Sequence, residues 1–365
     1  MMNFPVDYDP ILERLENIDP IRYAKTRNFI NGDVTYLSPY ISRGVLTLPQ
    51  IKEAVLIKGY KPYQIEKFLQ ELAWREFYQR VWFAKGDALF TDLKQAQLDV
   101  AHEQMIAAVM NAQTGIDAID QQIRHMYNTG YMHNHARMYI AGIACNIAKA
   151  YWKEPSRWMY YHLLDGDLAS NTCSWQWVAG SFSSKKYVAN QENINRYLFS
   201  KQQHTFLDCS YEQLETMPIP EALKFTSSLD LQTTLPITEK PLIEKGKPVL
   251  IYNSYNLNPL WRKEEVVNRI LLLEPSHFKK YPVSEKVLEF IIDLSKNITG
   301  IQVYCGEIDD LIESVKDELI ISKEHPAFSH YPGLKDNYDW MFPEVKGYHP
   351  SFFSYWKKCE RYLKT

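Results

Sequence analysis

The chain has 365 residues, 45% of them hydrophobic and 23% charged, which is normal for a globular protein with a large buried core. Its formal net charge of −3 at pH 7 excludes a general attraction to polyanions, so any contact with nucleic acid needs a local basic patch. The first residues, MMNFPVDYDP, contain neither a basic nor an apolar signal-peptide region, and no apolar run has the length of a membrane span. We therefore expect a protein without a signal peptide and without membrane contact.

The cysteines indicate a reducing compartment. There are five, an odd number, and no two have the CxxC spacing of a zinc or iron–sulfur site: Cys145, Cys173, Cys209, Cys305 and Cys359. We expect a cytoplasmic monomer without a metal site.

Residues 1–205 have the pattern of a mostly helical domain. Ser38-Pro39 and Thr47-Leu48-Pro49 each combine a hydroxyl cap with a proline in the first turn of a helix. The apolar spacing in QIEKFLQELAWREFYQRVW predicts a long helix over 64–82, and GYMHNHARMYIAGIACNIAKAYW predicts another over 130–152.

The pattern changes after residue 205. Residues 206–247 contain several prolines and predict a covering segment and linker, with a short helix near Tyr211–Leu214. Residues 248–330 alternate short apolar runs with helical stretches, which predicts parallel strands joined by crossovers in a small α/β domain. The expected strands are 248–252, 268–275, 301–306 and 318–323, and the expected helices are 285–297 and 307–316. Residues 331–365 form an aromatic-rich tail that we expect to be irregular. The predicted fold is thus mainly α, followed by a small α/β parallel-sheet domain.

The stretch LLDGDLASNTCSWQWVAGSF, residues 163–182, contains too little aliphatic bulk for a core helix. Asp165 and Asp167 lie near the beginning of a helix expected over 166–178, where the helix dipole stabilises negative charge. Trp175 and Trp177 are two positions apart, so they point to different sides of that helix. The simpler interpretation is a capped helix with two core tryptophans.

Two earlier stretches also combine unusual residue types. In VTYLSPYISRG, Thr35 and Ser38 place hydroxyl groups at a helix start, whose N–H groups suit a phosphate. In ELAWREFY, Glu71, Trp74 and Arg75 share one face of the expected helix, which is not the pattern of a core stripe. The simpler interpretations are an ordinary N-cap and a surface Glu71–Arg75 pair, which contributes only about 0.3–0.5 kcal/mol.

A further stretch, TGIDAIDQQIRHMYNTGYMHNHARM, places Asn134, Arg137 and Met138 on one mixed helical face, which partial exposure alone would also explain. Taken together, SPYISRGVL, FLQELAWREFY, TGIDAID…GYMHNHARM and DGDLASNTCSWQW resemble the FAD-binding domain of the photolyase/cryptochrome family. These blocks occur in the family's order and at its spacing, and they cover roughly residues 20–200. The resemblance implies an all-α domain that holds FAD in a bent conformation.

The resemblance also implies the cofactor site. Arg137 and Asp165 would form a salt bridge beside the isoalloxazine, because a reduced anionic flavin needs nearby cations and donors in a low dielectric. Asn171 would face flavin N5, and Asp167 would accept from a ring N–H or a ribose hydroxyl. The residues implied for the phosphates and ribose are Tyr23, Thr35, Leu37 and Ser38, and those implied around the flavin are Phe68, Arg75, Arg137, Asp165, Asp167 and Asn171.

The activity that the resemblance implies is that of a deoxyribodipyrimidine photolyase acting on UV-damaged DNA that contains pyrimidine dimers. Trp74 and Trp177 would contact a flipped-out dimer, while Glu71 and Asn134 would hydrogen-bond its edges and Met138 would contact its side. Extrusion of the lesion costs a few kcal/mol, and stacking returns about 1–3 kcal/mol per base. Asn134 and Met138 resemble the cyclobutane-dimer type, since the (6-4) type places histidine at both positions.

In the family, a chain of tryptophans carries electrons to the flavin. Trp175 and Trp152 would belong to this chain. The third tryptophan of the family would fall within residues 95–105, which contain no aromatic residue, so Trp158 or Tyr160 is the candidate substitute.

The positions that carry DNA-phosphate arginines in the family are Arg27, His135 and Asn190 in this chain, so only the first keeps its charge. Lys185 and Lys186 would supply the missing positive charge.

The order of the domains departs from the family. An α/β antenna domain normally precedes the FAD-binding domain, whereas the α/β segment 248–330 follows it here. VLIYNSYNLNPLW resembles the first strand and loop of that domain, and GIQVYCGEIDDL resembles a later strand and helix. We expect a shortened antenna-like domain, with boundaries at 1–205, 206–247, 248–330 and 331–365.

Two other functions stay open. A cryptochrome-like photoreceptor would use the same flavin and tryptophans but would signal through a partner, and the reduced number of DNA-facing arginines is compatible with that role. A helical interaction module without a cofactor would leave the mixed polar and aromatic faces unexplained. The presence of Glu71, Trp74, Asn134, Met138 and Trp177 favours repair.

Overall fold

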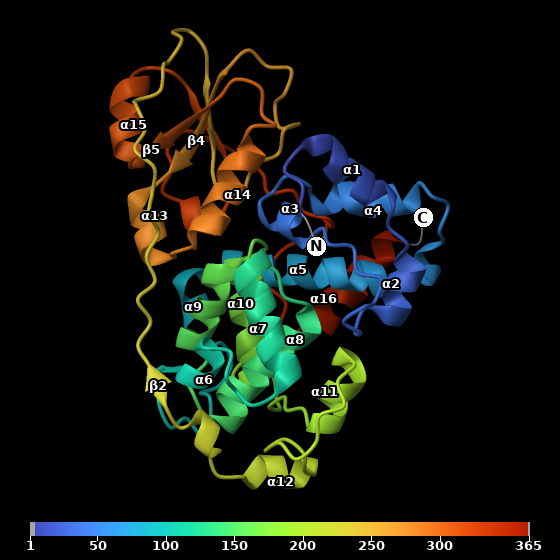
Figure 1. Cartoon of the computed structure of the whole chain (residues 1–365). Helices are drawn as coiled ribbons and strands as arrows, with labels where there is room; N and C mark the ends of the chain where they lie inside the picture. The colour runs from blue at the N-terminus through green and yellow to red at the C-terminus, as the bar shows by residue number, and fades with distance from the viewer. Residues whose placement is uncertain (1–3, 364–365) are drawn as a thin grey trace. The chain divides into compact units, whose positions relative to one another are not determined.

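The computed structural model describes residues 4–363 and is mostly helical, with a five-stranded parallel sheet in its C-terminal part (Figure 1). The chain divides into two compact units. Unit 1 comprises Met1–Pro20, Thr35–Phe83 and Gln232–Thr365, and unit 2 comprises Ile21–Val34 and Ala84–Leu231.

The N-terminal helices of unit 1 are α1 (Tyr8–Glu16), α3 (Ser38–Ser42), α4 (Leu48–Leu56) and α5 (Glu66–Lys85), the last of which ends at the boundary with unit 2. Thr47 caps α4 as predicted, because its hydroxyl accepts from the Gln50 N–H in a capping box. The predicted cap at Ser38 is wrong. Ser38 is the first helical residue, and the residue in the N-cap position is Leu37, whose side chain cannot accept a hydrogen bond.

The predicted helix over 64–82 is confirmed as α5, the longest helix in the part of the chain that the structure describes. Its buried side includes Phe68, Leu69 and Leu72. Two charged side chains are buried beside them: Glu76 is 0% exposed and Arg80 is 6% exposed, and the two form an ion pair of 3.1 Å.

The four predicted strands of the α/β segment are confirmed as β3 (Val249–Tyr252), β4 (Asn268–Leu273), β5 (Ile301–Cys305) and β6 (Ile320–Lys323). The sheet order is β5-β4-β3-β6-β7, and all neighbouring strands are parallel. The connecting helices are α13 (Pro275–Lys280), α14 (Glu285–Ser295) and α15 (Ile308–Val315), and Figure 1 shows α14 and α15 beside the strands.

Both faces of this sheet are buried, as expected for parallel strands with crossover helices. Val249, Ile251 and Ile270 belong to a core cluster that also contains Leu311 and Val315 of α15. The alternate strand residues, such as Leu250 and Leu271, are equally buried.

The C-terminal segment is more regular than predicted. Leu334–Asp336 forms β7 at the edge of the sheet, and Phe352–Cys359 forms the helix α16. Glu76 of α5 holds this segment, because its carboxylate accepts hydrogen bonds from the backbone N–H groups of Met341 and Phe342 and from the Tyr355 hydroxyl. The expected irregular tail is therefore part of the fold of unit 1.

Unit 2 is helical around one large apolar core. Its helices are α2 (Pro20–Thr26, which starts at the unit boundary), α6 (Ala107–Met110), α7 (Asp117–Thr129), α8 (Asn134–Gly142), α9 (Lys153–His162), α10 (Leu168–Ala179), α11 (Gln191–Leu198) and α12 (Tyr211–Thr216). A short antiparallel pair joins β1 (Met105–Ile106) to β2 (Thr226–Ser227). The short helix predicted near Tyr211–Leu214 is confirmed as α12.

The single helix predicted over 130–152 is wrong in length. α8 ends at Gly142 and continues as a π-helical turn over Ile143–Ile147, after which Lys149 adopts a left-handed conformation with φ 57°. The apolar spacing continues through this turn, so the sequence pattern could not reveal the break.

No helix within residues 4–363 is long and apolar enough to cross a membrane. In the same range, no three His, Cys, Asp or Glu side chains are grouped as metal ligands.

Candidate functional site

The site in unit 2 is organised around an ion pair between α8 and the loop before α10. Nη2 of Arg137 lies 3.0 Å from Oδ1 and 2.9 Å from Oδ2 of Asp165, and Nε of Arg137 donates to the Met132 carbonyl at 2.8 Å. The Arg137 side chain is 21% exposed and that of Asp165 is 5% exposed. The predicted pair therefore exists, and it presents part of a guanidinium at an otherwise buried position.

Gly166 allows this loop to lie against the end of α9. A Cβ atom at this position would lie 2.9 Å from the Tyr160 carbonyl and 3.0 Å from the Leu163 carbonyl, closer than neighbouring atoms normally approach. The glycine between the two aspartates is thus required by packing, which explains the DGD pattern in physical terms.

Asp167 begins α10 as its N-cap. Its Oδ1 accepts from the Ser170 N–H at 2.7 Å and from the Ser170 hydroxyl. One turn into the helix, the Asn171 amide nitrogen donates to the Ser156 carbonyl at 2.9 Å. Because this bond uses the amide nitrogen, the Asn171 amide oxygen is the atom that can accept a hydrogen bond from a ligand.

The two tryptophans of α10 have different environments, as predicted. Trp175 is 2% exposed and lies in the core cluster with Trp152 and Trp158, whereas Trp177 is 36% exposed and its ring centroid lies 5.9 Å from that of Tyr187. One side of α10 therefore faces the apolar core, and the other side faces the surface.

Trp152 is linked to a residue that sequence reasoning missed. The Trp152 indole N–H donates to Oδ1 of Asp92 at 2.7 Å, and the Tyr151 hydroxyl donates to the same oxygen at 3.2 Å. The two ring centroids are 5.5 Å apart. Burial, with a further contribution from Asp92, raises the pKa of Tyr151 to about 12. Of the two predicted substitutes, Trp158 is 1% and Tyr160 is 4% exposed, while Tyr151 is only half-buried.

On α8, Asn134 is the first helical residue and is exposed, and Met138 is half-buried one turn later. They share a face with Arg137, as the spacing predicted. Tyr23 of α2 is half-buried in the same unit.

The residues predicted to hold the phosphates in unit 1 form a tight turn. Thr35 Oγ1 accepts from the Leu37 N–H at 3.4 Å, and Tyr36 between them has φ 53°, a conformation that is strained for a residue with a side chain. Leu37 is 1% exposed, so its side chain anchors the turn in the core while Ser38 is half-buried.

The predicted face of α5 lies close to this turn within unit 1. Nη2 of Arg75 donates to the Ser42 hydroxyl of α3 at 3.0 Å, and Glu71 forms an ion pair with Lys67 at 3.3 Å. Phe68 is 2% exposed and contributes to the core. Arg75 therefore connects α5 to the helix that follows the turn.

Trp74 contacts a residue that no sequence pattern indicated. The Phe352 ring of α16 stacks on the Trp74 ring, with centroids 3.8 Å apart and planes 9° apart. Phe353 approaches the same tryptophan edge-on at 6.5 Å and is 70% exposed. One face of the predicted substrate-contacting tryptophan is thus covered by the C-terminal helix.

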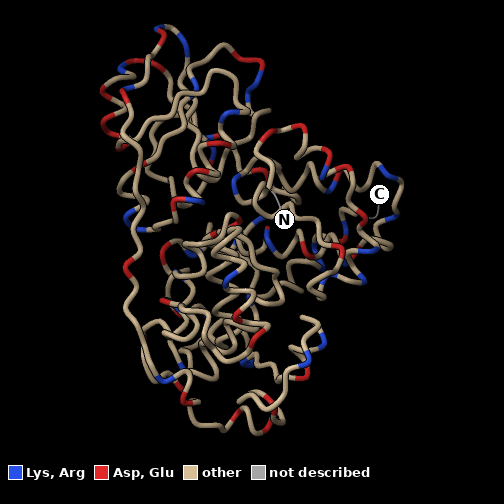
Figure 2. The backbone as a smooth tube through the Cα atoms, viewed as in Figure 1, with Lys and Arg blue, Asp and Glu red and all other residues tan. Residues whose placement is uncertain are grey.

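The residues predicted to contact DNA phosphates carry less charge than their number indicates. Burial, together with the charge of Arg27, lowers the pKa of His135 to about 4, so this histidine is neutral at pH 7. Lys186 forms an ion pair with Asp99 at 2.6 Å, while Lys185 is exposed. Along the backbone, acidic residues lie among the basic ones rather than leaving a long basic stretch (Figure 2).

Comparison with known proteins identifies the class of the domain. Residues 68–207 match the family model described as the FAD binding domain of DNA photolyase. This segment contains α8, the Arg137–Asp165 pair and α10. Residues 68–207 therefore form an FAD-binding photolyase domain.

Several relatives are named deoxyribodipyrimidine photo-lyase. The protein from Alkalihalophilus pseudofirmus is 33% identical over 162 residues, which are 43% of this chain and 34% of the relative. The protein from Synechococcus is 36% identical over 199 residues, or 48% of this chain and 41% of the relative. The protein from Agrobacterium fabrum is 25% identical over 247 residues, or 62% and 50%. The chain thus spans about a third to a half of the length of these relatives.

Two solved structures are also similar. A bacterial class III photolyase from Agrobacterium tumefaciens shares 22% identity and a TM-score of 0.45, over 52% of this chain and 44% of the other. A cryptochrome from Synechocystis shares 22% identity and a TM-score of 0.47, over 61% and 49%.

The residues of unit 2 fit a flavin. The Arg137 guanidinium is oriented by Asp165 and by a backbone carbonyl and supplies positive charge close to a buried carboxylate. The Asn171 oxygen is an acceptor, which suits the N5–H group of a reduced flavin.

Proposed function

We propose that this protein uses light and FAD to split cyclobutane pyrimidine dimers in DNA. The observation that carries the proposal is the division of α10 into two environments directly after the Arg137–Asp165 pair. Trp175 is 2% exposed in the apolar core, where it would carry electrons, and Trp177 is 36% exposed, where it would contact a substrate.

Bound FAD, when reduced and excited by light, would supply the electron that opens the dimer. Arg137 and Asp165 would set the charge at the cofactor, and Asn171 would accept a hydrogen bond from it. Because Asp165 is 5% exposed and both of its carboxylate oxygens contact Arg137, it keeps the guanidinium in one orientation.

The roles proposed toward the lesion belong in unit 1 to Glu71 and Trp74 and in unit 2 to Asn134, Met138 and Trp177, and each of the two tryptophans would provide an aromatic face. Two tryptophans can offset the cost of extruding a dimer, since each stacking contact returns about 1–3 kcal/mol. Lys185 is exposed and Arg27 is half-buried, and both would contact DNA phosphates. Lys186 would contact a phosphate once its ion pair with Asp99 is broken.

Tyr151 would replace the missing third tryptophan. When Trp152 passes an electron inward, its indole would be left oxidised. Tyr151 would then give one electron to the Trp152 indole, while the Tyr151 hydroxyl proton moves to Asp92. The 3.2 Å hydrogen bond would provide the path for that proton. Being half-buried, Tyr151 is more accessible than Trp158 or Tyr160 to an external reductant.

The direct test is repair by the full chain loaded with FAD and reduced chemically. An oligonucleotide with one cyclobutane thymine dimer is illuminated with blue light beside one with a (6-4) product, and the repaired strands are separated chromatographically. We expect light-dependent repair of the first substrate only. Absence of flavin in the purified and reconstituted protein, or faster repair of the (6-4) product, would contradict the proposal.

A second candidate function is a photoreceptor of the cryptochrome type, and the Trp74–Phe352 stack favours it. A tryptophan whose face is covered by the protein's own helix is less ready to accept a base. In that case the flavin-loaded protein would photoreduce normally but would repair neither lesion, even after chemical reduction.

A further inference from the structure

Two segments of unit 2 that are far apart in the sequence form a basic surface. Residues 21–30 and 193–204 together contain five Lys or Arg residues and no Asp or Glu. The Ile30 N–H donates to the Tyr197 carbonyl at 3.0 Å, so the two segments lie side by side. The five cations are Lys25, Arg27, Arg196, Lys201 and Arg22, the last of which also pairs with Asp33 at 3.3 Å. All of them except Arg27 are exposed, so a chain with a net charge of −3 carries a local basic patch here.

Two stacked phenylalanine rings lie on this surface. The Phe29 and Phe199 rings have centroids 5.7 Å apart and planes 21° apart. Tyr197 extends the group, because its ring centroid lies 5.1 Å from that of Phe29. Phe199 is 58% exposed, whereas Phe29 and Tyr197 are half-buried. Phe199 is therefore the outer ring of this Phe29–Phe199 stack, and much of its ring is open to solvent.

Packing within the chain explains little of why position 199 is a phenylalanine. Phe199 follows the last residue of α11 as its C-cap, with φ 54° and ψ 39° in the left-handed region. Glycine or asparagine is usual at such a position, since a Cβ atom makes this conformation unfavourable. A bulky apolar side chain can offset that cost by being buried, but Phe199 is mostly exposed. A contact with a molecule outside the chain would account for the aromatic ring.

Cations and flat rings are interleaved around the stack. Arg27, a proposed phosphate contact, precedes Phe29 by two residues, and the Arg196 guanidinium lies 5.4 Å from the centroid of the Tyr197 ring. His135, which is neutral at pH 7, adds a further ring 4.7 Å from that of Tyr197. Proteins that bind single-stranded nucleic acid combine these two features, because cations follow the phosphates and flat rings stack on the bases.

The form of the ligand follows from the geometry of base stacking. In a duplex, both faces of an internal base are covered by its neighbours, so only an unpaired or terminal base can lie on a protein ring at the surface. A membrane surface suits the patch less well, because a segment that binds lipid needs a helix with a free apolar side. In α11, Ile194 is 0% exposed and packs inside the unit. The chemistry therefore favours an unpaired nucleobase with phosphates on either side.

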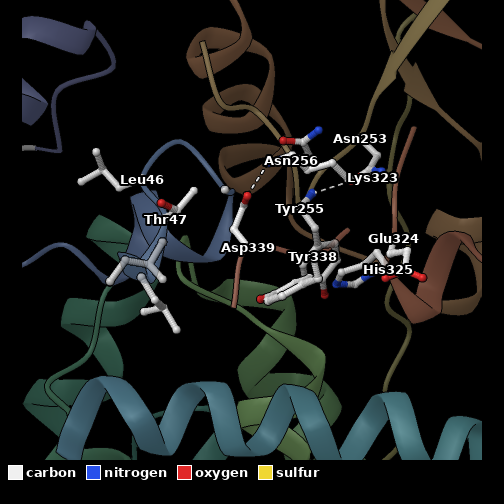
Figure 3. Close-up of a pocket in the computed structure, with 13 residues that line it drawn as sticks. Leu46, Thr47, Asn253, Tyr255, Asn256, Lys323, Glu324, His325, Tyr338 and Asp339 are labelled. Carbon is white, nitrogen blue, oxygen red and sulfur yellow. Dashed lines mark hydrogen bonds and ion pairs between the residues drawn. The ribbon is translucent and has the colours of Figure 1, made fainter. Parts of the chain in front are cut away.

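A hollow in unit 1 offers no alternative place for a base. It lies beyond the ends of β3 and β6, and Asn253, Tyr255 and Lys323 are among the residues that line it (Figure 3). Its volume is about 40 Å³, which is enough for a few water molecules but not for a nucleobase. A base therefore fits the open Phe29–Phe199 stack better than this hollow.

We infer that the Phe29–Phe199 stack binds an unpaired base of single-stranded DNA, while Arg196 and the neighbouring cations contact the adjoining phosphates. This contact needs neither flavin, nor light, nor a dimer. The inference therefore goes beyond the proposed repair, because the same chain would also hold undamaged single strands.

The test is fluorescence anisotropy in the dark with the FAD-loaded full chain and labelled, undamaged probes. The probes are a single-stranded oligothymidylate, its duplex with oligodeoxyadenylate, and a strand of abasic units that keeps the phosphates but has no bases. We expect the single strand to bind more tightly than both others. Phe199→Leu should weaken the binding of oligothymidylate about fivefold or more and leave that of the abasic strand unchanged, because leucine offers no flat ring.

Two further variants separate charge and exposure from stacking. Arg196 is exposed, so Arg196→Gln should weaken the binding of the single strand and of the abasic strand alike, and should reduce the slope of log affinity against log salt by about one. Phe225→Leu is the matched control, because Phe225 is 72% exposed in the same unit but lies beside β2. This variant should bind all three probes as the unmodified protein does. Circular dichroism verifies that each variant is folded.

Four results would overturn the inference. The first is undiminished binding of oligothymidylate by a folded Phe199→Leu protein. The second is that the abasic strand binds as tightly as oligothymidylate, because the bases would then contribute nothing. The third is tighter binding of the duplex than of the single strand. The fourth is that Phe199→Leu loses binding to phosphatidylserine vesicles rather than to DNA, which would assign the patch to a membrane surface. A protein that binds the single strand as expected but repairs no dimer would contradict only the proposed function.

Discussion

Replacement of Phe352 by Leu should strengthen the binding of dimer-containing DNA. The Phe352 ring covers one face of Trp74 with centroids 3.8 Å apart, so a base that stacks on this face has to displace it first. Leucine keeps the apolar volume of a side chain that is 2% exposed, but it lacks the flat ring. The variant therefore weakens the side chain that competes with a base for the face of Trp74, without opening a cavity in unit 1.

The size of the effect follows from the geometry. An offset or parallel aromatic pair contributes about 0.5–1.5 kcal/mol beyond its buried area, and this is the part that leucine removes. Since about 1.4 kcal/mol corresponds to a factor of ten in affinity, the variant should bind the lesion about 2-fold to 10-fold more tightly. The loss of folding stability should stay below about 1.5 kcal/mol.

The assay is fluorescence anisotropy in the dark at one fixed salt concentration, with a labelled oligonucleotide that contains a thymine dimer and an undamaged copy. Phe353→Leu is the control, because Phe353 is 70% exposed and meets Trp74 only edge-on. Unchanged or weaker lesion binding by a folded Phe352→Leu protein would refute the reasoning, and it would show that DNA does not approach the covered face.

Three further predictions concern electron supply, stability and pH. Trp175→Phe should greatly slow the photoreduction of FAD and leave repair by chemically reduced protein intact, whereas Trp177→Phe should do the reverse. Flavin absorbance under blue light, measured beside the repair assay, distinguishes the two variants. The opposite pattern would mean that Trp175 contacts the substrate and Trp177 supplies electrons. Glu76→Ala should lower the free energy of unfolding by about 3–5 kcal/mol, because it leaves Arg80 buried at 6% exposure without its carboxylate, and a loss below about 1 kcal/mol in urea denaturation would contradict this. Because the pKa of His135 in the folded protein is about 4, below its ordinary value of 6.5, its contribution to stability is present above pH 6.5 and is lost as the pH falls toward 4. Thermal denaturation of His135→Asn should accordingly show a weaker dependence on pH in that interval than the unmodified protein.

The parts of the fold that the sequence predicted are those in which each segment contains its own signal. β3 and β4 are continuous apolar runs, and the length of such runs is enough to mark buried parallel strands. β7 contains only Leu334, Lys335 and Asp336 and lies at the edge of the sheet, so it has neither the length nor the burial that would reveal it. The π-helical turn after Gly142 was missed because its apolar residues continue the spacing of α8.

The candidate site was predictable to the extent that its residues are neighbours along one helix or loop. The Arg137–Asp165 pair joins residues 28 positions apart, and only the resemblance to a known family indicated it. No local pattern connects Trp74 to Phe352, because that contact depends on how the C-terminal helix packs. The role proposed for Tyr151 follows the same principle, since it rests on the hydrogen bond to Asp92, 59 positions away.

The buried carboxylate of Glu76 has a consequence for the order in which the chain can fold during synthesis. Its partners Met341 and Tyr355 are 265 and 279 positions away, and near the N-terminus the Tyr8 N–H donates to the Asn297 side chain across 289 positions. A ribosome that adds about 5–20 residues per second takes tens of seconds to cover such separations. Helices α1, α3, α4 and α5 of unit 1 therefore emerge long before the strands and helix that complete their core. Most of unit 2, in contrast, is one continuous stretch from Ala84 to Leu231 and can fold while the rest is being translated. Until the last segment arrives, the side of α5 that packs in the finished fold and the carboxylate of Glu76 are without the partners that Met341, Phe342 and Tyr355 provide.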